Sequence, residues 1–196
     1  MTEKEKAAKG VLYNANKDEA LLSERMKAKD MLHYYNSLQP SKEDERRQVI
    51  QNLLGKTGDV FMFESPFICD YGYNIEIGEN FYANVNLVIL DGAKVTIGSN
   101  VFIAPHVGIY TAGHAFDEVL RAEGLEYALP ITIGNNVWIG GGVQILPGVN
   151  IGDNTIVGAG SIVSKDIPSG VLAVGNPCKV IREISEADRR KYNYLP

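Results

Sequence analysis

The chain of 196 residues contains three histidines, and histidine is the residue type best suited to acid–base chemistry near neutral pH. His33 lies in a stretch with helical periodicity and is expected to be a surface or packing residue. His106 follows Pro105 at an outward position of a repeat. His114 begins a polar segment, in Thr-Ala-Gly-His, where a rigid scaffold could hold it at the edge of a loop. His114 is therefore the best candidate for a general base.

The two cysteines, Cys69 and Cys178, offer no comparable chemistry. They lie far apart and form no metal-ligand pattern such as C-x-x-C, so we expect two free thiols in a reducing compartment. The first residues are too charged for a signal peptide, and no apolar run approaches the length of a membrane span. These features favour a cytoplasmic protein. A net charge of −5 gives no reason to expect nucleic acid or an anionic membrane as partner.

The elements that must position His114 are six-residue repeats. From Ile133 onward every sixth residue is an aliphatic β-former, and the next position is mostly glycine. The aliphatic series is Ile133, Ile139, Ile145, Ile151, Val157 and Val163. A short fixed period is typical of a solenoid, because six residues suffice for one short strand and one corner. Three repeats would then close a coil of about 18 residues.

A weaker block of repeats precedes this series. It contains Ile97, Ile103 and Ile109 and, before a two-residue phase slip, Ile77, Ala83, Ile89 and Val95. An ordinary parallel α/β sheet is the alternative, but no amphipathic helix lies between the strands, as parallel crossovers require. Tight corners that leave no room for a Cβ would explain most of the 20 glycines. We therefore predict a mainly β fold, a parallel β-helix from about Ile75 to Ile167.

A helical segment over residues 1–58 is predicted to precede the β-helix of residues 59–184. One apolar helix face is formed by Leu21, Ala28, Leu32 and Tyr35. Ser41 is expected to cap a second helix, with Asp44 at its third position and Val49, Ile50, Leu53 and Leu54 on its apolar side. Gly55 and Gly58 would end it.

Two further segments depart from the repeat. Residues near 112–130 carry charges, aromatic residues and glycine. They predict an extruded loop with His114 near its start. Residues 185–196 start with Ser185 and Asp188, the pattern of a helix cap. They predict a short C-terminal helix that covers the open end of the coil.

Several stretches resemble the maltose/galactoside O-acetyltransferase family of hexapeptide-repeat acyltransferases, and most closely its maltose-type members. They are CDYGYNIEIGENFYANVN (69–86), YTAGH (110–114), ITIGNNVWIGGGVQILPGVNIGDN (131–154), VGAGSIVSKDIP (157–168) and GNPCKVIREI (175–184), with LYNANKDEALLSERMKAKDMLHYYN (12–36) in the helical segment. The resemblance implies a left-handed β-helix and a homotrimer with active sites between subunits. It also implies acetyl-CoA as co-substrate and a sugar hydroxyl as acceptor, without a metal or a covalent enzyme intermediate.

The resemblance assigns roles to particular residues. It makes His114 the general base, oriented either by a backbone carbonyl near Glu126 or by the Glu126 carboxylate. Independently of the resemblance, a tetrahedral intermediate needs backbone N–H donors, and Gly140, Gly141 and Gly142 would let the main chain approach it closely. The acceptor side would comprise Asp70, Tyr82, Asn84 and Glu126. The cofactor side would comprise Trp138, Gly141, Ala159, Ser164, Lys165, Lys179 and Arg182.

One departure bears on the acceptor. Galactoside-type members carry an acid where this chain has Gly92, next to Asp91. The sequence therefore favours a maltose- or glucose-like acceptor over a galactoside.

Three alternatives remain open at this point. The acceptor could be an antibiotic or another non-sugar hydroxyl, because related scaffolds share a CoA groove while acceptor pockets differ. A γ-type carbonic anhydrase would need three histidine ligands, and the eight-residue spacing of His106 and His114, with His33 in the helical segment, supports a zinc site poorly. A non-catalytic trimeric scaffold would need the repeats but not His114 or its loop.

Overall fold

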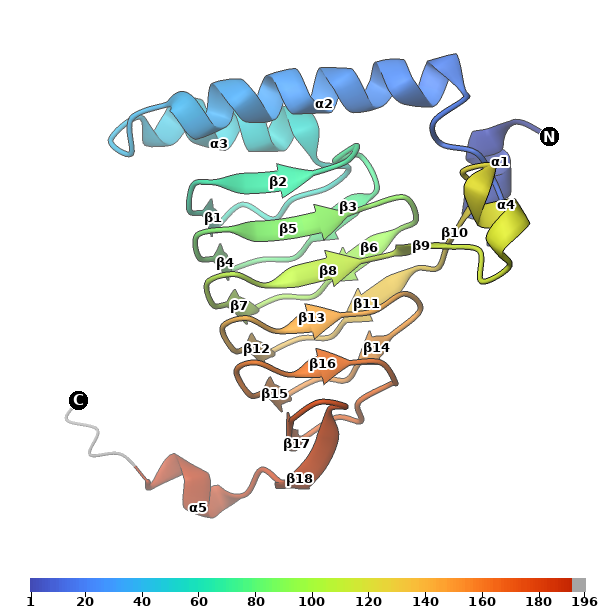
Figure 1. Cartoon of the computed structure of the whole chain (residues 1–196). Coiled ribbons are helices and arrows are strands. Elements are labelled where there is room, and N and C mark those ends of the chain that lie inside the picture. The colour runs from blue at the N-terminus through green and yellow to red at the C-terminus, as the bar shows by residue number, and fades with distance from the viewer. Residues whose placement is uncertain (192–196) are drawn as a thin grey trace.

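The structure is a computed structural model that describes residues 1–191. Its repeats form a parallel β-helix with three sheets, capped at one end by helices (Figure 1). Sheet 1 contains β1 (Phe61–Phe63), β4 (Phe81–Ala83), β7 (Phe102–Ile103), β12 (Trp138–Ile139), β15 (Ile156–Val157) and β17 (Val171–Val174), and at its edge β18 (Lys179–Glu183). Sheet 2 contains β2 (Phe67–Cys69), β5 (Leu87–Leu90), β8 (Gly108–Tyr110), β13 (Gln144–Ile145) and β16 (Ile162–Val163). Sheet 3 contains β3 (Ile75–Ile77), β6 (Val95–Ile97), β11 (Ile131–Ile133) and β14 (Asn150–Ile151).

The coils wind in the left-handed sense that the resemblance implied. In Figure 1 the strands of sheet 2 run from left to right across the front, and each circuit returns behind and one level lower. Parallel crossovers in proteins are otherwise almost always right-handed. The predicted β-helix is confirmed. The six-residue period of the sequence does not determine its handedness.

The length of a coil changes along the chain. Phe61 pairs with Phe81 across a step of 20 residues, whereas Trp138 pairs with Ile156 across a step of 18. The additional residues of the early coils lie where the chain passes from sheet 2 to sheet 3, a place we call corner 2–3. It comprises residues 70–74, 91–94, 111–130, 146–149 and 164–166 in successive coils. The phase slip in the sequence and the extruded loop therefore have one structural origin.

Stacked aliphatic side chains fill the coil. All six members of the series from Ile133 to Val163 are buried, and aromatic side chains of the first two coils, including Phe63, Phe67 and Phe81, close the interior at the helical end. The glycine that follows the inward residue is required by close packing. A Cβ on Gly140, for example, would lie 2.6 Å from the backbone nitrogen of Ala159 in the next coil. The prediction that tight corners explain these glycines is confirmed.

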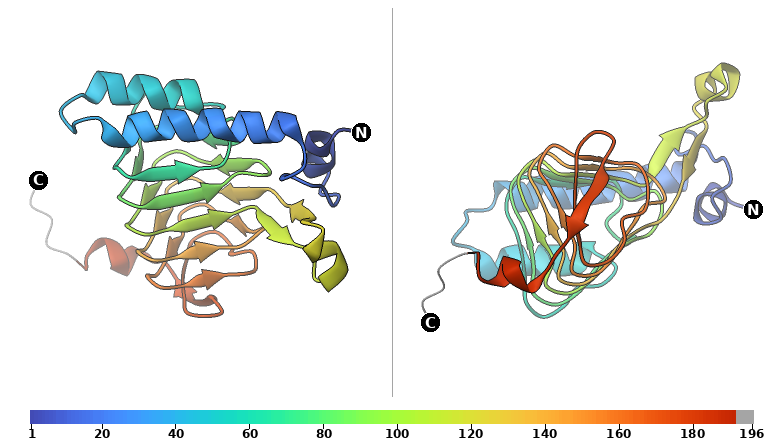
Figure 2. Two further views of the ribbon diagram at one scale, coloured as in Figure 1. Left: turned by 45° about the horizontal axis from the view of Figure 1, so that its top comes forward. Right: turned by 90° about the horizontal axis from the view of Figure 1, so that it is seen from below.

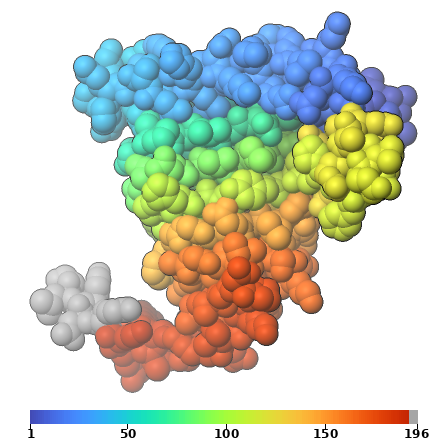
Figure 3. All heavy atoms as spheres, viewed as in Figure 1, coloured from blue at the N-terminus to red at the C-terminus, as the bar shows by residue number. Residues whose placement is uncertain are grey.

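Helices α2 (Glu19–Ser37) and α3 (Glu43–Leu53) form a layer over the first coil (Figures 1 and 3), whereas α1 (Glu3–Ala8) lies beside the hairpin described below. The predicted face of α2 is buried at all four positions, Leu21, Ala28, Leu32 and Tyr35. Ser41 does not cap α3, whose N-cap is Lys42 without a side-chain hydrogen bond; three acidic residues in the first turn favour the helix dipole there instead. Arg46 of α3 is buried, and it donates to the backbone carbonyl of Phe63. Among the helices of residues 1–191, none has the length and apolarity needed to cross a membrane.

The extruded loop is an ordered hairpin rather than an irregular segment. Strands β9 (Ala112–His114) and β10 (Glu126–Ala128) pair in antiparallel fashion, and the five-residue helix α4 (Glu118–Ala122) closes the tip, which projects from the coil in Figures 1 and 2. Phe116 at this tip is 93% exposed.

The C-terminal prediction was wrong in one respect. Strand β18 pairs in antiparallel fashion with β17. It crosses the open end of the coil, as the right-hand view in Figure 2, seen from below, shows. Helix α5 (Glu186–Arg189) has the predicted capping box of Ser185 and Asp188, but none of its residues is buried. A strand that continues the sheet covers the end of the coil because it can satisfy the free edge of β17, which a four-residue helix cannot. The rest of the predicted helix, residues 192–196, lies outside the described residues.

Candidate active site

The hairpin at corner 2–3 sets His114 opposite Glu126. The two residues are register partners between β9 and β10, and His114 Nε2 lies 4.0 Å from Glu126 Oε1. The His114 side chain is 54% exposed, whereas that of Glu126 is only 16% exposed. A carboxylate at this distance stabilises an imidazolium that forms when the histidine accepts a proton. His114 and Glu126 are therefore placed so that they could act as a base and its counter-ion.

Tyr13 is a third member of this group, and the sequence analysis missed it. Its backbone N–H donates to the Glu126 carbonyl and its carbonyl accepts from the Glu126 N–H, both at 2.9 Å. Its hydroxyl donates to Glu126 Oε2 at 3.3 Å. Burial raises the pKa of Tyr13, and the nearby Glu126 carboxylate raises it further, so the hydroxyl keeps its proton. A lone tyrosine in a short non-helical stretch between two helices was the only sequence signal for it.

Asp70 lies at the same corner, two coils closer to the helices. Burial raises the pKa of Asp70, Arg25 opposes that shift, and Glu126 adds to it. The charge of Glu126 in the hairpin therefore acts on the Asp70 carboxyl. The turn that holds Asp70 is fixed by the buried Asp91, whose carboxylate accepts from the backbone N–H groups of Asp70, Tyr71 and Gly72 at 2.7–3.0 Å. Asp70, Glu126 and His114 thus belong to one corner. The sequence analysis did not predict the role of Asp91.

The other two predicted acceptor residues lie elsewhere. Tyr82 is on the outer face of sheet 1, in register with Phe102, which is in turn in register with Trp138. Asn84 follows β4, where the chain turns from sheet 1 to sheet 2 (corner 1–2), and its Oδ1 accepts from the Val85 N–H. One chain therefore does not bring Tyr82 and Asn84 to His114.

The three glycines after β12 also lie at corner 1–2, and they differ in what constrains them. Gly140 is fixed by its close approach to the next coil, and Gly142 has a positive φ of 71°. Their N–H groups donate within the coil, to Val157 and Pro105. The expectation that all three could offer N–H donors is therefore wrong. Gly141 has neither constraint, and in residues 1–191 its N–H has no hydrogen-bond acceptor.

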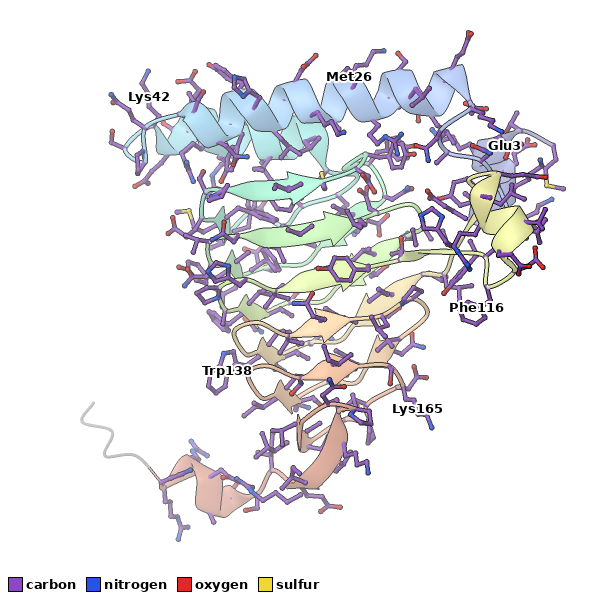
Figure 4. All side chains as sticks on the ribbon, viewed as in Figure 1. Glu3, Met26, Lys42, Phe116, Trp138 and Lys165 are labelled. Carbon is purple, nitrogen blue, oxygen red and sulfur yellow. The ribbon has the colours of Figure 1, made fainter. Side chains whose placement is uncertain are left out.

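The predicted cofactor residues fall into separate groups. Trp138, which is 53% exposed, lies on sheet 1, and Gly141 and Ala159 lie at corner 1–2. Ser164 and Lys165 are exposed at corner 2–3, below the hairpin; Figure 4 shows Trp138 and Lys165 at opposite edges of the coil.

Lys179 and Arg182 are exposed on β18. The Arg182 guanidinium is already engaged by Asp188, through Nη1–Oδ2 and Nη2–Oδ1 contacts of 2.7 and 2.6 Å.

The histidines do not form a metal site. His106 is exposed at corner 1–2, with a positive φ of 61°, and His114 is at corner 2–3. Within residues 1–191 no group of three or more histidine, cysteine, aspartate or glutamate side chains could hold a metal ion. This arrangement gives the carbonic anhydrase alternative no support. Of the two free thiols, Cys69 is buried and Cys178 is half-buried.

Comparison with known proteins identifies the family. Residues 6–58 match the maltose acetyltransferase hexapeptide capping motif, and residues 130–165 match the bacterial transferase hexapeptide repeats. A Saccharomyces cerevisiae protein assigned as an acetyltransferase is 62% identical over 185 residues, 94% of each chain.

Two solved structures have the same fold over nearly the whole chain. A maltose O-acetyltransferase from Clostridium difficile 630 is 50% identical, with a TM-score of 0.93 and coverage of 95% of this chain and 99% of that one. A galactoside acetyltransferase in complex with coenzyme A is 46% identical, also with a TM-score of 0.93. The match covers 100% of this chain and 96% of that one. The chain belongs to the maltose and galactoside acetyltransferase family of hexapeptide-repeat enzymes.

Proposed function

We propose that this enzyme transfers the acetyl group of acetyl-CoA to a hydroxyl group of a maltose- or glucose-like sugar, with His114 as general base. The observation that carries the proposal is the facing pair of His114 and Glu126 on an ordered hairpin. An exposed imidazole with a half-buried carboxylate beside it can accept a proton and hold the resulting charge. Asp70 at the same corner would accept a hydrogen bond from a second sugar hydroxyl.

The reaction follows from this geometry. As the sugar oxygen attacks the thioester carbonyl carbon, its proton moves to His114, and Glu126 stabilises the imidazolium. The Gly141 N–H, which the coil does not use, is the candidate donor to the oxyanion of the tetrahedral intermediate. The intermediate then expels the sulfur of CoA, which takes the proton from His114. The products are an acetylated sugar and free CoA thiol.

The distribution of residues supports a shared site in a homotrimer. Tyr82, Asn84, Trp138 and Gly141 lie on sheet 1 or at corner 1–2, whereas Asp70, His114 and Lys165 lie at corner 2–3. An edge-to-edge assembly would set corner 2–3 of one copy against sheet 1 of its neighbour. The exposed side chains of Met62, Phe102 and Trp138 provide an apolar outer face on sheet 1 for such a contact.

The cofactor side of the proposal rests on residue chemistry. Trp138 offers a flat apolar surface for part of the CoA chain, and Lys165, Lys179 and Arg182 offer cations for its phosphates. The galactoside acetyltransferase with 46% identity was solved with coenzyme A bound. We propose direct transfer of the acetyl group from acetyl-CoA to the sugar hydroxyl.

The proposal is tested by measuring CoA thiol release with maltose, glucose, a galactoside and small non-sugar alcohols as acceptors. The expected result is turnover with maltose and glucose that exceeds turnover with the galactoside. Turnover with a non-sugar alcohol alone would replace the assigned acceptor class, and release with no acceptor preference would refute an acceptor-side role for corner 2–3.

A further inference from the structure

The N-terminal segment reaches into the candidate active site through Tyr13. Residues between α1 and α2 pass along the outer edge of the hairpin, where Tyr13 and Glu126 exchange two backbone hydrogen bonds. Asn14 adds a second anchor, since its Nδ2 donates to the Glu123 carbonyl at 2.9 Å. The bridge at Tyr13 and the Asn14 contact therefore hold the segment against β10, on the side of the hairpin that carries Glu126.

The Tyr13 ring is locked in place by a small core separate from the coil. Tyr13 is 2% exposed and packs in a buried cluster that also contains Ala7, Leu21, Tyr71, Ala93 and Ala128. A side chain held this firmly presents its hydroxyl in one position. That hydroxyl faces Glu126 Oε2, while Glu126 Oε1 faces His114.

Gly92 is the residue that leaves room for this hydroxyl. A Cβ at position 92 would lie 2.8 Å from the Tyr13 oxygen, while its other neighbours, the Cβ atoms of Ala128 and Ala112, would be at ordinary distances of 3.5 and 3.6 Å. Gly92 has no positive φ among the backbone angles of the described chain, so its backbone does not require glycine. The clearance for Tyr13 is therefore the one local reason for glycine at this position.

We infer that Tyr13 is a positioning residue that holds the Glu126 carboxylate toward His114, and that Gly92 is the specific partner that makes room for it. Glutamate has three rotatable side-chain bonds, so a Glu126 side chain without a fixed partner would populate several rotamers. A fixed phenol that donates to one carboxylate oxygen leaves the other directed at the imidazole. The inference rests on the proposed function of His114 and adds the element that orients its counter-ion.

The two variants Tyr13→Phe and Gly92→Ala test the inference together. Tyr13→Phe keeps the buried ring and removes only the hydroxyl, and we expect a roughly fivefold loss of kcat, with KM for acetyl-CoA and for the acceptor unchanged. Gly92→Ala should cause a similar loss, because the new methyl group displaces the hydroxyl. In the double variant the clash is absent, so Gly92→Ala should cost nothing beyond Tyr13→Phe. Equal losses from Gly92→Ala in both backgrounds would overturn the assigned role of Gly92.

The route through Glu126 has its own test. If Tyr13 acts only by orienting Glu126, Tyr13→Phe should have no further effect in a Glu126→Ala background, and an additional fivefold loss there would refute that route. The matched control is Tyr73→Phe, which removes a hydroxyl from a tyrosine that packs on the same cluster but donates to Glu24 at 2.6 Å. We expect that control to retain the wild-type kcat.

A second readout does not depend on acetyl transfer. With three histidines in the chain, the Cε1–H NMR resonance of His114 is assigned by its loss in His114→Ala. Tyr13→Phe and Gly92→Ala should shift this resonance in the same direction, and Tyr73→Phe should leave it in place. An unmoved resonance in Tyr13→Phe would overturn the inference even if the enzyme is active. A wild type that transfers no acetyl group, with the resonance shifting as expected, would instead refute the proposed function.

Discussion

The Arg182 guanidinium and the Asp188 carboxylate form a two-pronged ion pair that ties β18 to α5. The same carboxylate accepts from the Ser185 N–H and so closes the capping box of α5. The residue proposed to meet a phosphate of CoA is therefore already held by an anion. A phosphate must share or displace that partner before Arg182 can bind it.

Loss of this competing anion should strengthen cofactor binding. In Asp188→Asn the guanidinium is released while the side chain keeps its shape, so we expect KM for acetyl-CoA to fall by roughly two- to fivefold, with the difference shrinking as salt is added. Steady-state kinetics at low and high ionic strength measure this effect. A higher KM in the variant would show that Asp188 orients Arg182 rather than competing for it.

A site shared between copies predicts complementation. His114→Ala removes the base from corner 2–3, and Asn84→Ala removes an acceptor contact from corner 1–2, so each variant alone should be nearly inactive. Mixed assemblies of the two should regain activity, because some interfaces then combine an intact His114 with an intact Asn84. Coexpression with two purification tags isolates such assemblies. Mixed assemblies as inactive as either parent would refute a site between copies.

Asp91 predicts a pH dependence of stability. Burial raises the pKa of this carboxyl to about 6 from 3.8, although hydrogen bonds from the backbone of Tyr71 and Gly72 oppose the shift. Because the folded protein binds this proton more tightly than the unfolded chain, the stabilisation is complete below about pH 4 and is lost as pH rises through about 6.

The variant Asp91→Asn removes this titration and also loses part of the carboxylate's hydrogen bonding. Wild type should therefore exceed the variant in free energy of unfolding by a larger margin at about pH 4.5 than at about pH 7.5, by on the order of 2 kcal/mol. Urea denaturation at the two pH values measures this margin. A margin that grows with pH would contradict the raised pKa.

Gly140 and Gly141 should respond differently to the same substitution. Gly140→Ala places a methyl group 2.6 Å from the Ala159 backbone nitrogen and should destabilise the coil by roughly 1–3 kcal/mol. In Gly141→Ala the nearest atom is the Pro105 carbonyl oxygen at 3.4 Å, so stability should be nearly retained while KM for acetyl-CoA rises. Thermal unfolding and kinetics of the pair separate the two effects. A normal KM in Gly141→Ala would remove this residue from the proposed cofactor site.

The sequence was sufficient for the fold because one rule repeats in it. Each inward aliphatic residue stacks on its equivalent, and each failure of the six-residue period marks a coil in which corner 2–3 is longer or shorter than usual. The hairpin itself was predicted only as a loop. Its two strands are short, and the bridge from Glu126 to Tyr13 joins residues far apart in the chain. Helix α3 starts without the expected side-chain cap, and its first turn is acidic instead. The spacing of apolar residues carries no information on which of these features stabilises a helix start.

The candidate site was harder to predict because its members are distant in sequence. Asp91 looks like a polar corner residue until the structure shows three backbone N–H groups directed at it. Where the chain turns from sheet 3 to sheet 1, four asparagines adopt positive φ and form a chain of side-chain amide hydrogen bonds, which the sequence analysis did not predict: Asn80, Asn100, Asn136 and Asn154. Short polar side chains tolerate this backbone region, so glycine was not required.

The most direct test of the account is acetyl transfer to maltose by His114→Ala. Loss of a general base should lower kcat by at least roughly 100-fold while KM for acetyl-CoA and the thermal stability stay close to those of wild type. Thiol-release kinetics on the folded variant, with wild type in parallel, give the answer. Wild-type turnover by His114→Ala would contradict the assignment of His114 as the base and, with it, the proposed mechanism.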